Sequence, residues 1–182
     1  MTDMKILPAK PSEFDEIRAF YHTLIDEMAD SPYPPGWQKG VYPADAALRD
    51  ALAVGTLYTG RLNGRMVSAM IVNHESNEGY RQIHWPTDAD DAAVTVIHAL
   101  GVRPADSGRG FAKQMVRQVL TMARQAGQKA VRLDVLGGNR PAERLYTGLG
   151  FRYAGTVRMF YEDTGWTDFL LYEYPLADCG RV

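Results

Sequence analysis

The first group of residues that could do chemistry is a glycine-rich turn between an apolar run and an amphipathic pattern. Val94–Val102 is rich in β-branched residues, which indicates a buried strand, and Pro104 ends it. Gly108 and Gly110 come next, and a helical pattern begins at Phe111. Glycines let the main chain approach a ligand closely, and the start of a helix leaves N–H groups without partners. This order therefore predicts a turn that binds an anion.

The residues after the turn predict a helix with one apolar face. Phe111, Met115, Val119 and Met122 recur at helical spacing, and Gly127 ends the pattern as a C-cap glycine would. A P-loop is excluded because no Gly-Lys-Ser/Thr follows, and a dinucleotide fingerprint is excluded because no third glycine opens the helix. By itself the turn is equally compatible with a tight strand-to-helix connection.

A second candidate group is the pair Asn139 and Tyr146, which are seven residues apart. That spacing is close to two helical turns, so the amide and the phenol share a helix face and can line one slot. Each residue also has a purely structural interpretation. Asn139 could cap a helix, and Tyr146 could be an interior aromatic with a local hydrogen bond.

The elements around these residues predict a mixed α/β sheet. Ala130–Leu136 is a second apolar run after the helix, so the two strands should lie parallel with the helix across one face. The remaining predicted elements are strands at 4–9, 56–62, 65–74, 151–159 and 168–174, and helices at 12–30, 44–54 and 139–149. Asn63-Gly64 predicts a hairpin, Ser12 with Asp15 a capping-box-like start, and Tyr80–Trp85 an extension of a strand.

Composition limits the classes of function. With 182 residues, the chain suits one domain. Its formal charge of −2 lacks the positive excess needed for nonspecific electrostatic binding to nucleic acid or to an anionic membrane. The N-terminus has no signal-peptide core, and no apolar run reaches the ~20 residues that cross a bilayer, so we expect a cytoplasmic chain. Cys179 is expected to be an ordinary tail thiol, and the spacing of the histidines predicts no metal site.

Two motifs in this order resemble the GNAT superfamily of N-acetyltransferases. The turn at 107–112 is similar to the acetyl-CoA loop Arg/Gln-x-x-Gly-x-Gly/Ala, which Gly110 and Ala112 match. The segment at 139–151 is similar to Asn-x-x-Ala-x-x-x-Tyr followed by Gly-Phe. Together the motifs cover roughly residues 94–151, and two motifs separated by one helix and one strand are much more specific than either alone.

This resemblance implies a GNAT-like fold, a mixed and mostly antiparallel twisted sheet of about 6–7 strands with about four helices. Its central parallel strands should splay around the acyl-CoA site. The single domain would span 1–182, with acceptor-side helices and a hairpin in 1–93, the acetyl-CoA-binding core in 94–151, and C-terminal strands and a tail in 152–182. In this superfamily a C-terminal strand pair often supports a dimer, so the resemblance leaves a monomer and a homodimer open.

The resemblance also implies residue roles. Asn139 would hydrogen-bond the pantetheine arm, and Tyr146 would donate a proton to the departing CoA thiolate. The residues expected to bind acetyl-CoA are Leu100, Gly101, Val102, Ser107, Gly108, Arg109, Gly110, Phe111, Ala112, Lys113, Asn139, Ala142 and Tyr146.

Two positions depart from the family pattern. Ser107 stands where Arg or Gln is usual, and Val96 stands where many members carry a catalytic carboxylate. His98 lies on the same strand face as Val96, and a histidine there resembles the arrangement in arylalkylamine acetyltransferases, so it is a candidate general base. A core histidine is the equal alternative, and Glu75 or water could also take the proton.

The leading hypothesis is acetyl transfer from acetyl-CoA to a primary amine of a small molecule. A peptide or protein N-acetyltransferase and a non-catalytic acyl-CoA sensor are the alternatives. The loop at 31–43 has four prolines and three aromatic residues, so it is either a packed lid or a binding loop. Candidate acceptor-binding residues are Tyr21, Tyr33, Trp37 and Tyr42.

Overall fold

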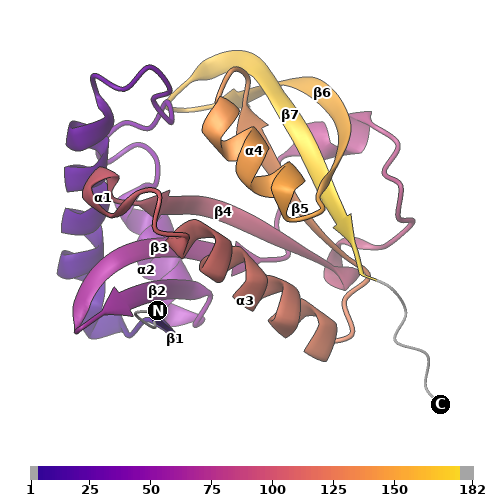
Figure 1. Ribbon diagram of the computed structural model, residues 1–182. Helices are drawn as coiled ribbons and strands as arrows, with labels where there is room; N and C mark the ends of the chain where they lie inside the picture. Colours follow the sequence, from indigo (N-terminus) through magenta and orange to yellow (C-terminus); the bar gives the residue numbers. More distant parts are fainter. Residues whose placement is uncertain (1–3, 177–182) are drawn as a thin grey trace.

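The seven strands form one sheet in the order β1-β2-β3-β4-β5-β7-β6 (Figure 1). The computed structural model describes residues 4–176, so Cys179 lies outside the described residues. The strands are β1 Lys5–Pro8, β2 Leu57–Leu62, β3 Arg65–Asn73, β4 Val94–Val102, β5 Ala130–Leu136, β6 Arg152–Tyr161 and β7 Gly165–Pro175. The α-helices are α1 Phe14–Met28, α2 Asp45–Ala53, α3 Phe111–Gln125 and α4 Arg140–Gly148.

The sheet is mixed, as the sequence predicts. β4 and β5 are parallel, and the other neighbouring strands pair antiparallel. The parallel pair follows from the crossover through α3, which must return the chain to the same end of the sheet. The Asn63-Gly64 hairpin also forms, with φ of 50° and 82°, the left-handed values that its tight turn needs.

The two central strands separate after three residue pairs, which confirms the splayed arrangement. Val94–Val96 pairs with Ala130–Arg132, and beyond these positions β4 and β5 are no longer hydrogen-bonded to each other. On its other side β4 stays paired with β3, but the register shifts: Ile71 is opposite His98, whereas Ala69 is opposite Gly101. The extra residue makes a bulge, which bends β4 and re-aims its side chains.

Helices cover both faces of the sheet (Figure 1). α3 and α4 pack on one face, α1 and α2 pack on the other, and each pair shares a separate apolar core with the strands. A third apolar cluster lies under β6 and β7, where the segment before β4 covers it. The central strands are therefore buried on both faces, which explains why β4 and β5 read as near-continuous apolar runs.

Two local predictions were wrong. Helix α1 starts at Phe14 after a 3-10 turn, Pro11–Glu13, and the capping contact joins the Lys10 N–H to the Glu13 carboxylate at 2.6 Å instead of using Ser12 and Asp15. The residues Tyr80–Trp85 do not form a strand, because Glu78–Gln82 is a 3-10 helix and the Trp85 Nε1–H donates to the Tyr80 carbonyl at 2.8 Å.

Candidate active site

The predicted anion-binding turn forms between β4 and α3. Gly108 and Gly110 have φ of 72° and 82°, a left-handed backbone that glycine adopts without strain. A Cβ at either glycine would meet nothing within 4 Å, so the turn faces open space. Gly110 is the N-cap of α3 and no side chain caps it, which leaves the first N–H groups of the helix available to a ligand.

A buried carboxylate that the sequence analysis missed anchors this turn. Asp106 is 2% exposed and accepts two 2.8 Å hydrogen bonds from the Arg65 guanidinium and one of 3.1 Å from Arg109. The hydrogen bonds from Arg65 hold the pKa of Asp106 below its usual value. Arg109 also lies over the ring of Phe111, with its guanidinium carbon 4.8 Å from the centroid. Lys113 is exposed in the first turn of α3.

A channel of about 450 Å³ leads from this turn along β4. It is lined by Leu24, Glu27, Met28, Ser31, Tyr33, Pro35, Trp37, Leu100, Gly101, Val102, Pro104, Ser107, Asn139 and Pro141. Of the predicted cofactor residues, the channel brings together Leu100, Gly101 and Val102 of the strand, Ser107 of the turn and Asn139 at the start of α4. Gly101 lies close to α1, since a Cβ there would lie 2.9 Å from Leu24 Cδ1 and the Leu24 side chain would have to shift.

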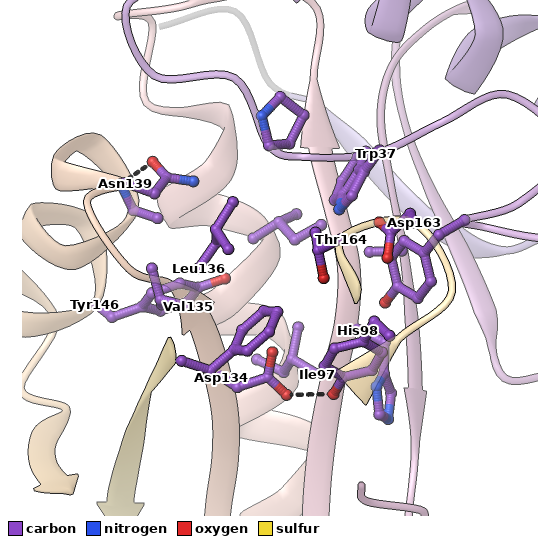
Figure 2. Close-up of a pocket in the computed structure, with 17 residues that line it drawn as sticks. Trp37, Ile97, His98, Asp134, Val135, Leu136, Asn139, Tyr146, Asp163 and Thr164 are labelled. Atoms are coloured by element: carbon purple, nitrogen blue, oxygen red, sulfur yellow. Dashed lines mark hydrogen bonds between the residues drawn. The ribbon is translucent and has the colours of Figure 1, made fainter. Parts of the chain in front are cut away.

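A second cavity, of about 110 Å³, lies where β4 and β5 have separated (Figure 2). It shares Pro35, Trp37, Leu100 and Asn139 with the channel, so the two spaces meet there. Its other lining residues are Tyr42, Ile97, His98, Ala99, Asp134, Val135, Leu136, Ala142, Tyr146, Tyr161, Asp163, Thr164 and Phe169. The walls therefore come from β4, β5, α4, the loop at 31–43 and the turn between β6 and β7.

The pair Asn139 and Tyr146 reaches this cavity from α4, as the helical spacing predicts (Figure 2). Asn139 is the N-cap of the helix, and its side-chain oxygen accepts the Ala142 N–H at 3.3 Å, which confirms the capping interpretation. Tyr146 is 7% exposed and packs edge-on against Phe151, with ring centroids 5.4 Å apart. Burial raises the pKa of Tyr146 well above its ordinary value, so its hydroxyl keeps its proton at neutral pH.

His98 lines the cavity in its neutral form. Burial lowers its pKa to about 4. Its Nε2 lies 2.8 Å from Oδ1 of Asn73, and that oxygen also accepts the backbone N–H of Glu75 at 3.0 Å. Because a side-chain amide oxygen only accepts, Nε2 of His98 carries the proton and donates it.

Asp134 on β5 is a second carboxylate that the sequence analysis missed. The hydroxyls of Tyr80 and Tyr161 both donate to its Oδ2, each at 2.8 Å. Burial raises the pKa of Asp134 in spite of these two hydrogen bonds, which act to lower it. A carboxylate within the apolar run Ala130–Leu136 was the available signal, but the strand pattern alone does not show that its side chain lines a cavity.

The four predicted acceptor residues separate into three groups. Trp37 and Tyr42 line the smaller cavity, and Tyr33 lines only the channel. Tyr21 lines neither: it is 1% exposed, and its hydroxyl donates to the Ala99 carbonyl at 2.8 Å. Tyr21 therefore does not line the space predicted for the acceptor. Helix α1 buries its ring against the sheet, and its hydroxyl contacts the bulge of β4 instead.

Within residues 4–176 no helix is long and apolar enough to cross a membrane. Over the same residues, no group of three or more His, Cys, Asp or Glu side chains is arranged to hold a metal ion.

Two curated relatives match part of the chain. N-alpha-acetyltransferase RimI of Mycobacterium tuberculosis is 36% identical over 69 residues, which are 38% of this chain and 42% of that protein. Mycothiol acetyltransferase of Actinosynnema mirum is 35% identical over 68 residues, 37% of this chain and 23% of that protein. The matched part thus spans less than half the length of each relative.

Solved structures share the fold over nearly the whole chain. A GNAT family acetyltransferase from Streptococcus agalactiae superposes with a TM-score of 0.80 and 20% identity, covering 96% of both chains. yncA, a putative acetyltransferase from Salmonella typhimurium solved with its cofactor acetyl-CoA, has a TM-score of 0.68 and 16% identity, covering 99% of this chain and 98% of the other. At these identities the likeness concerns the fold.

The family model described as "Acetyltransferase (GNAT) family" matches residues 22–151, more than two thirds of the chain. That range contains both motifs, the separated strands and the α4 residues that line the cavity. The chain therefore belongs to the acetyltransferase (GNAT) family.

Proposed function

We propose that this chain transfers the acetyl group of acetyl-CoA directly to a primary amine of a small molecule. The observation that carries the proposal is the junction between the two spaces. A channel that begins at an anion-binding turn meets, at Leu100 and Asn139, a cavity lined by a protonated phenol and a buried carboxylate. A thioester reaching the junction would be within a space that holds both an acid and a base.

The turn and the channel fit the two chemical parts of CoA. The uncapped N-terminus of α3 and the left-handed glycines offer N–H groups to the pyrophosphate, with Arg109 and Lys113 nearby. Beyond the turn, β4 has no partner on the β5 side after Val96, so its main-chain groups on that side are available to the amides of pantetheine. The side chain of Asn139 borders the same path.

Acetyl-CoA supplies an acetyl group activated as a thioester, and the residues of this chain supply the proton transfers. The amine arrives mostly as an ammonium ion and must lose a proton before it attacks the carbonyl carbon. Oδ2 of Asp134 is held by two tyrosine hydroxyls, which leaves its Oδ1 to accept that proton. The neutral amine then bonds to the carbonyl carbon, and Tyr146 donates its hydroxyl proton to the thiolate as the carbon–sulfur bond breaks. The proton that the acetylated nitrogen releases restores the Tyr146 hydroxyl.

Asp134 is a better candidate for the base than His98. The raised pKa of Asp134 lies closer to the pH at which an enzyme works, so its carboxylate is a stronger base than an ordinary one. His98, with a pKa of about 4, is a weak proton acceptor, and its Nε2–H is already hydrogen-bonded to Asn73. We assign His98 the position of a neutral wall residue beside the reacting atoms. Glu75 contacts this network through its backbone: its N–H donates to Asn73, and a hydrogen bond between the Glu75 backbone and His98 partly offsets the lowering of the His98 pKa by burial.

The shape of the cavity favours a compact acceptor. The loop at 31–43 is fastened over it, because the Gln38 amide donates to the Asp163 carbonyl at 2.5 Å and Gly36 packs against Thr164. A peptide amine is the second candidate, which the partial likeness to RimI favours. A non-catalytic sensor is disfavoured because the cavity retains both Asp134 and Tyr146.

The test is release of CoA thiol from acetyl-CoA over a panel of small amines, amino acids and short peptides, together with direct measurement of acetyl-CoA binding. We expect thiol release that depends on a small amine. Thiol release only with peptides would show that the acceptor is a peptide and not a small molecule. Binding of acetyl-CoA without thiol release would support the sensor, and absence of acetyl-CoA binding would refute the proposal entirely.

A further inference from the structure

The acceptor side of the smaller cavity carries a carboxylate that the proposed reaction does not use. Asp163 lies in the turn between β6 and β7, beside Thr164 and on the side of the cavity away from Tyr146 (Figure 2). It is 9% exposed, and among the described residues its buried Oδ1 has no hydrogen-bond partner. Burial raises the pKa of Asp163, although backbone hydrogen bonds from Asp163 and Thr164 act to lower it. A buried, unpaired carboxylate oxygen costs free energy, so this position is suited to a ligand that supplies a donor.

The charges around Asp163 indicate the sign of that ligand. None of the 17 residues that line the cavity is a lysine or an arginine. The acidic side chains are Asp134 and Asp163, and His98 is neutral. Since two carboxylates without a cation disfavour any anionic group, the cavity should exclude acceptors that carry a carboxylate of their own.

Part of the wall of this cavity is aromatic. The ring of Tyr42 lies 5.9 Å from Trp37 and 6.1 Å from Tyr161, and Tyr161 lies 4.9 Å from Phe169, measured between centroids. Aromatic faces bind alkyl chains by contact and attract ammonium groups through the ring quadrupole. This wall therefore suits a short carbon chain that carries positive charge.

We propose that the acceptor is a short aliphatic diamine, whose first nitrogen is acetylated beside Asp134 and Tyr146 while Asp163 binds the second nitrogen as an ammonium ion. The inference rests on the proposed function, which it makes specific. A monoamine or a peptide N-terminus would fill the first position and leave Oδ1 of Asp163 unpaired. Acetylation converts one ammonium into an amide, so the product keeps a single positive charge.

The test compares three acceptors of equal length: 1,4-diaminobutane, 1-aminobutane and 4-aminobutanoate. We expect kcat/KM for the diamine to exceed that for the monoamine by about tenfold or more, the effect of one charge-assisted hydrogen bond in a partly buried site. The amino acid should be the poorest of the three. Diamines with two to five carbons then locate the best spacing between the nitrogens.

Asp163→Asn should reduce the ratio of diamine to monoamine kcat/KM toward one. Glu162→Gln is the matched control, since it removes the same charge from an exposed residue of the same turn and should keep the ratio. Because burial raises the pKa of Asp163, its charge disfavours folding at neutral pH, so Asp163→Asn should not lower the melting temperature, which shows that the variant folds. A diamine that is no better than the monoamine, or a ratio that Asp163→Asn leaves unchanged, overturns the inference.

A binding measurement separates this inference from the proposed function. We expect 1,4-diaminobutane to bind the wild-type protein in the presence of CoA, as measured by calorimetry, and to bind Asp163→Asn more weakly. That result supports the diamine site even if no amine releases CoA thiol. Thiol release from monoamines with no diamine binding would keep the proposed function and refute the diamine site.

Discussion

The hydroxyl of Tyr21 donates a 2.8 Å hydrogen bond to the carbonyl oxygen of Ala99, the residue at which β4 leaves the ordinary strand conformation. Ala99 has a φ of 49°, a left-handed value that costs free energy in any residue except glycine. The bulge at this position lies beyond Val96, the last β4 residue that pairs with β5, and within the stretch 97–100 that lines the cavity. Tyr21 therefore holds the backbone at the place where the thioester should lie.

Tyr21→Phe tests this contact. The change leaves the buried Ala99 carbonyl without its donor, which should lower the free energy of unfolding by about 1–3 kcal/mol. We expect kcat to fall more than the affinity for acetyl-CoA, because the variant moves the bulge and leaves the turn at 107–112 intact. Denaturation curves and steady-state kinetics measure both. Tyr153→Phe, at an exposed position, is the control and should change neither.

Tyr146→Phe tests the general acid. Phenylalanine keeps the edge-on contact with Phe151 and removes only the proton donor, so stability should be retained. We expect kcat to fall about 100-fold or more, as for loss of a positioned acid, with nearly unchanged acetyl-CoA affinity. Turnover at the wild-type rate would contradict the role.

Asp134→Asn tests the base through pH dependence. The wild-type rate should rise with pH as Asp134 loses its proton, with a midpoint above the ordinary carboxyl value of 3.8 because burial raises its pKa. The variant should be slow and should lack that limb of the pH–rate profile. A variant that keeps the limb would transfer the role to another group.

The same substitution has an expected effect on stability. A carboxylate with a raised pKa in the folded state favours folding below that pKa and disfavours it above, since the unfolded chain releases the proton more easily. The stability of the wild type relative to Asp134→Asn should therefore fall as pH rises from 3.8 through the raised pKa. Urea denaturation of both proteins over this range measures the difference.

His98→Gln separates the two candidate bases. Because burial lowers the pKa of His98 to about 4, its ring is neutral at neutral pH and does not change its charge there. The substitution should lower the rate by a similar factor at each pH and leave the midpoint of the profile in place. Loss of the rising limb would instead identify His98 as the base.

Asp106→Asn tests the anchor of the glycine turn. The variant keeps the shape of the side chain but loses the charge that attracts Arg65 and Arg109. We expect KM for acetyl-CoA to rise several-fold with a smaller change in kcat, because in the proposed function the turn binds the cofactor and lies away from the reacting atoms. Asp15→Asn, on the exposed side of α1, should leave KM unchanged.

Much of the fold could be predicted because its signals are local. The strands at 94–102 and 130–136 and the helix between them follow from apolar periodicity, and their parallel order follows from the crossover. Asn63-Gly64 identified the hairpin for the same reason. The errors at Ser12 and at Tyr80–Trp85 occurred where capping and aromatic contacts outweighed weak sequence patterns.

The sequence by itself determined the residues of the site that are close along the chain. Gly108 with Gly110, and Asn139 with Tyr146, take their relative positions from a turn and from one helix, so spacing was sufficient. The tertiary structure alone decided which carboxylates belong to the site. Asp134 meets Tyr80 and Tyr161 across 54 and 27 positions of sequence, and Asp106 meets Arg65 across 41. These partners depend on strand order and register, which no local pattern encodes.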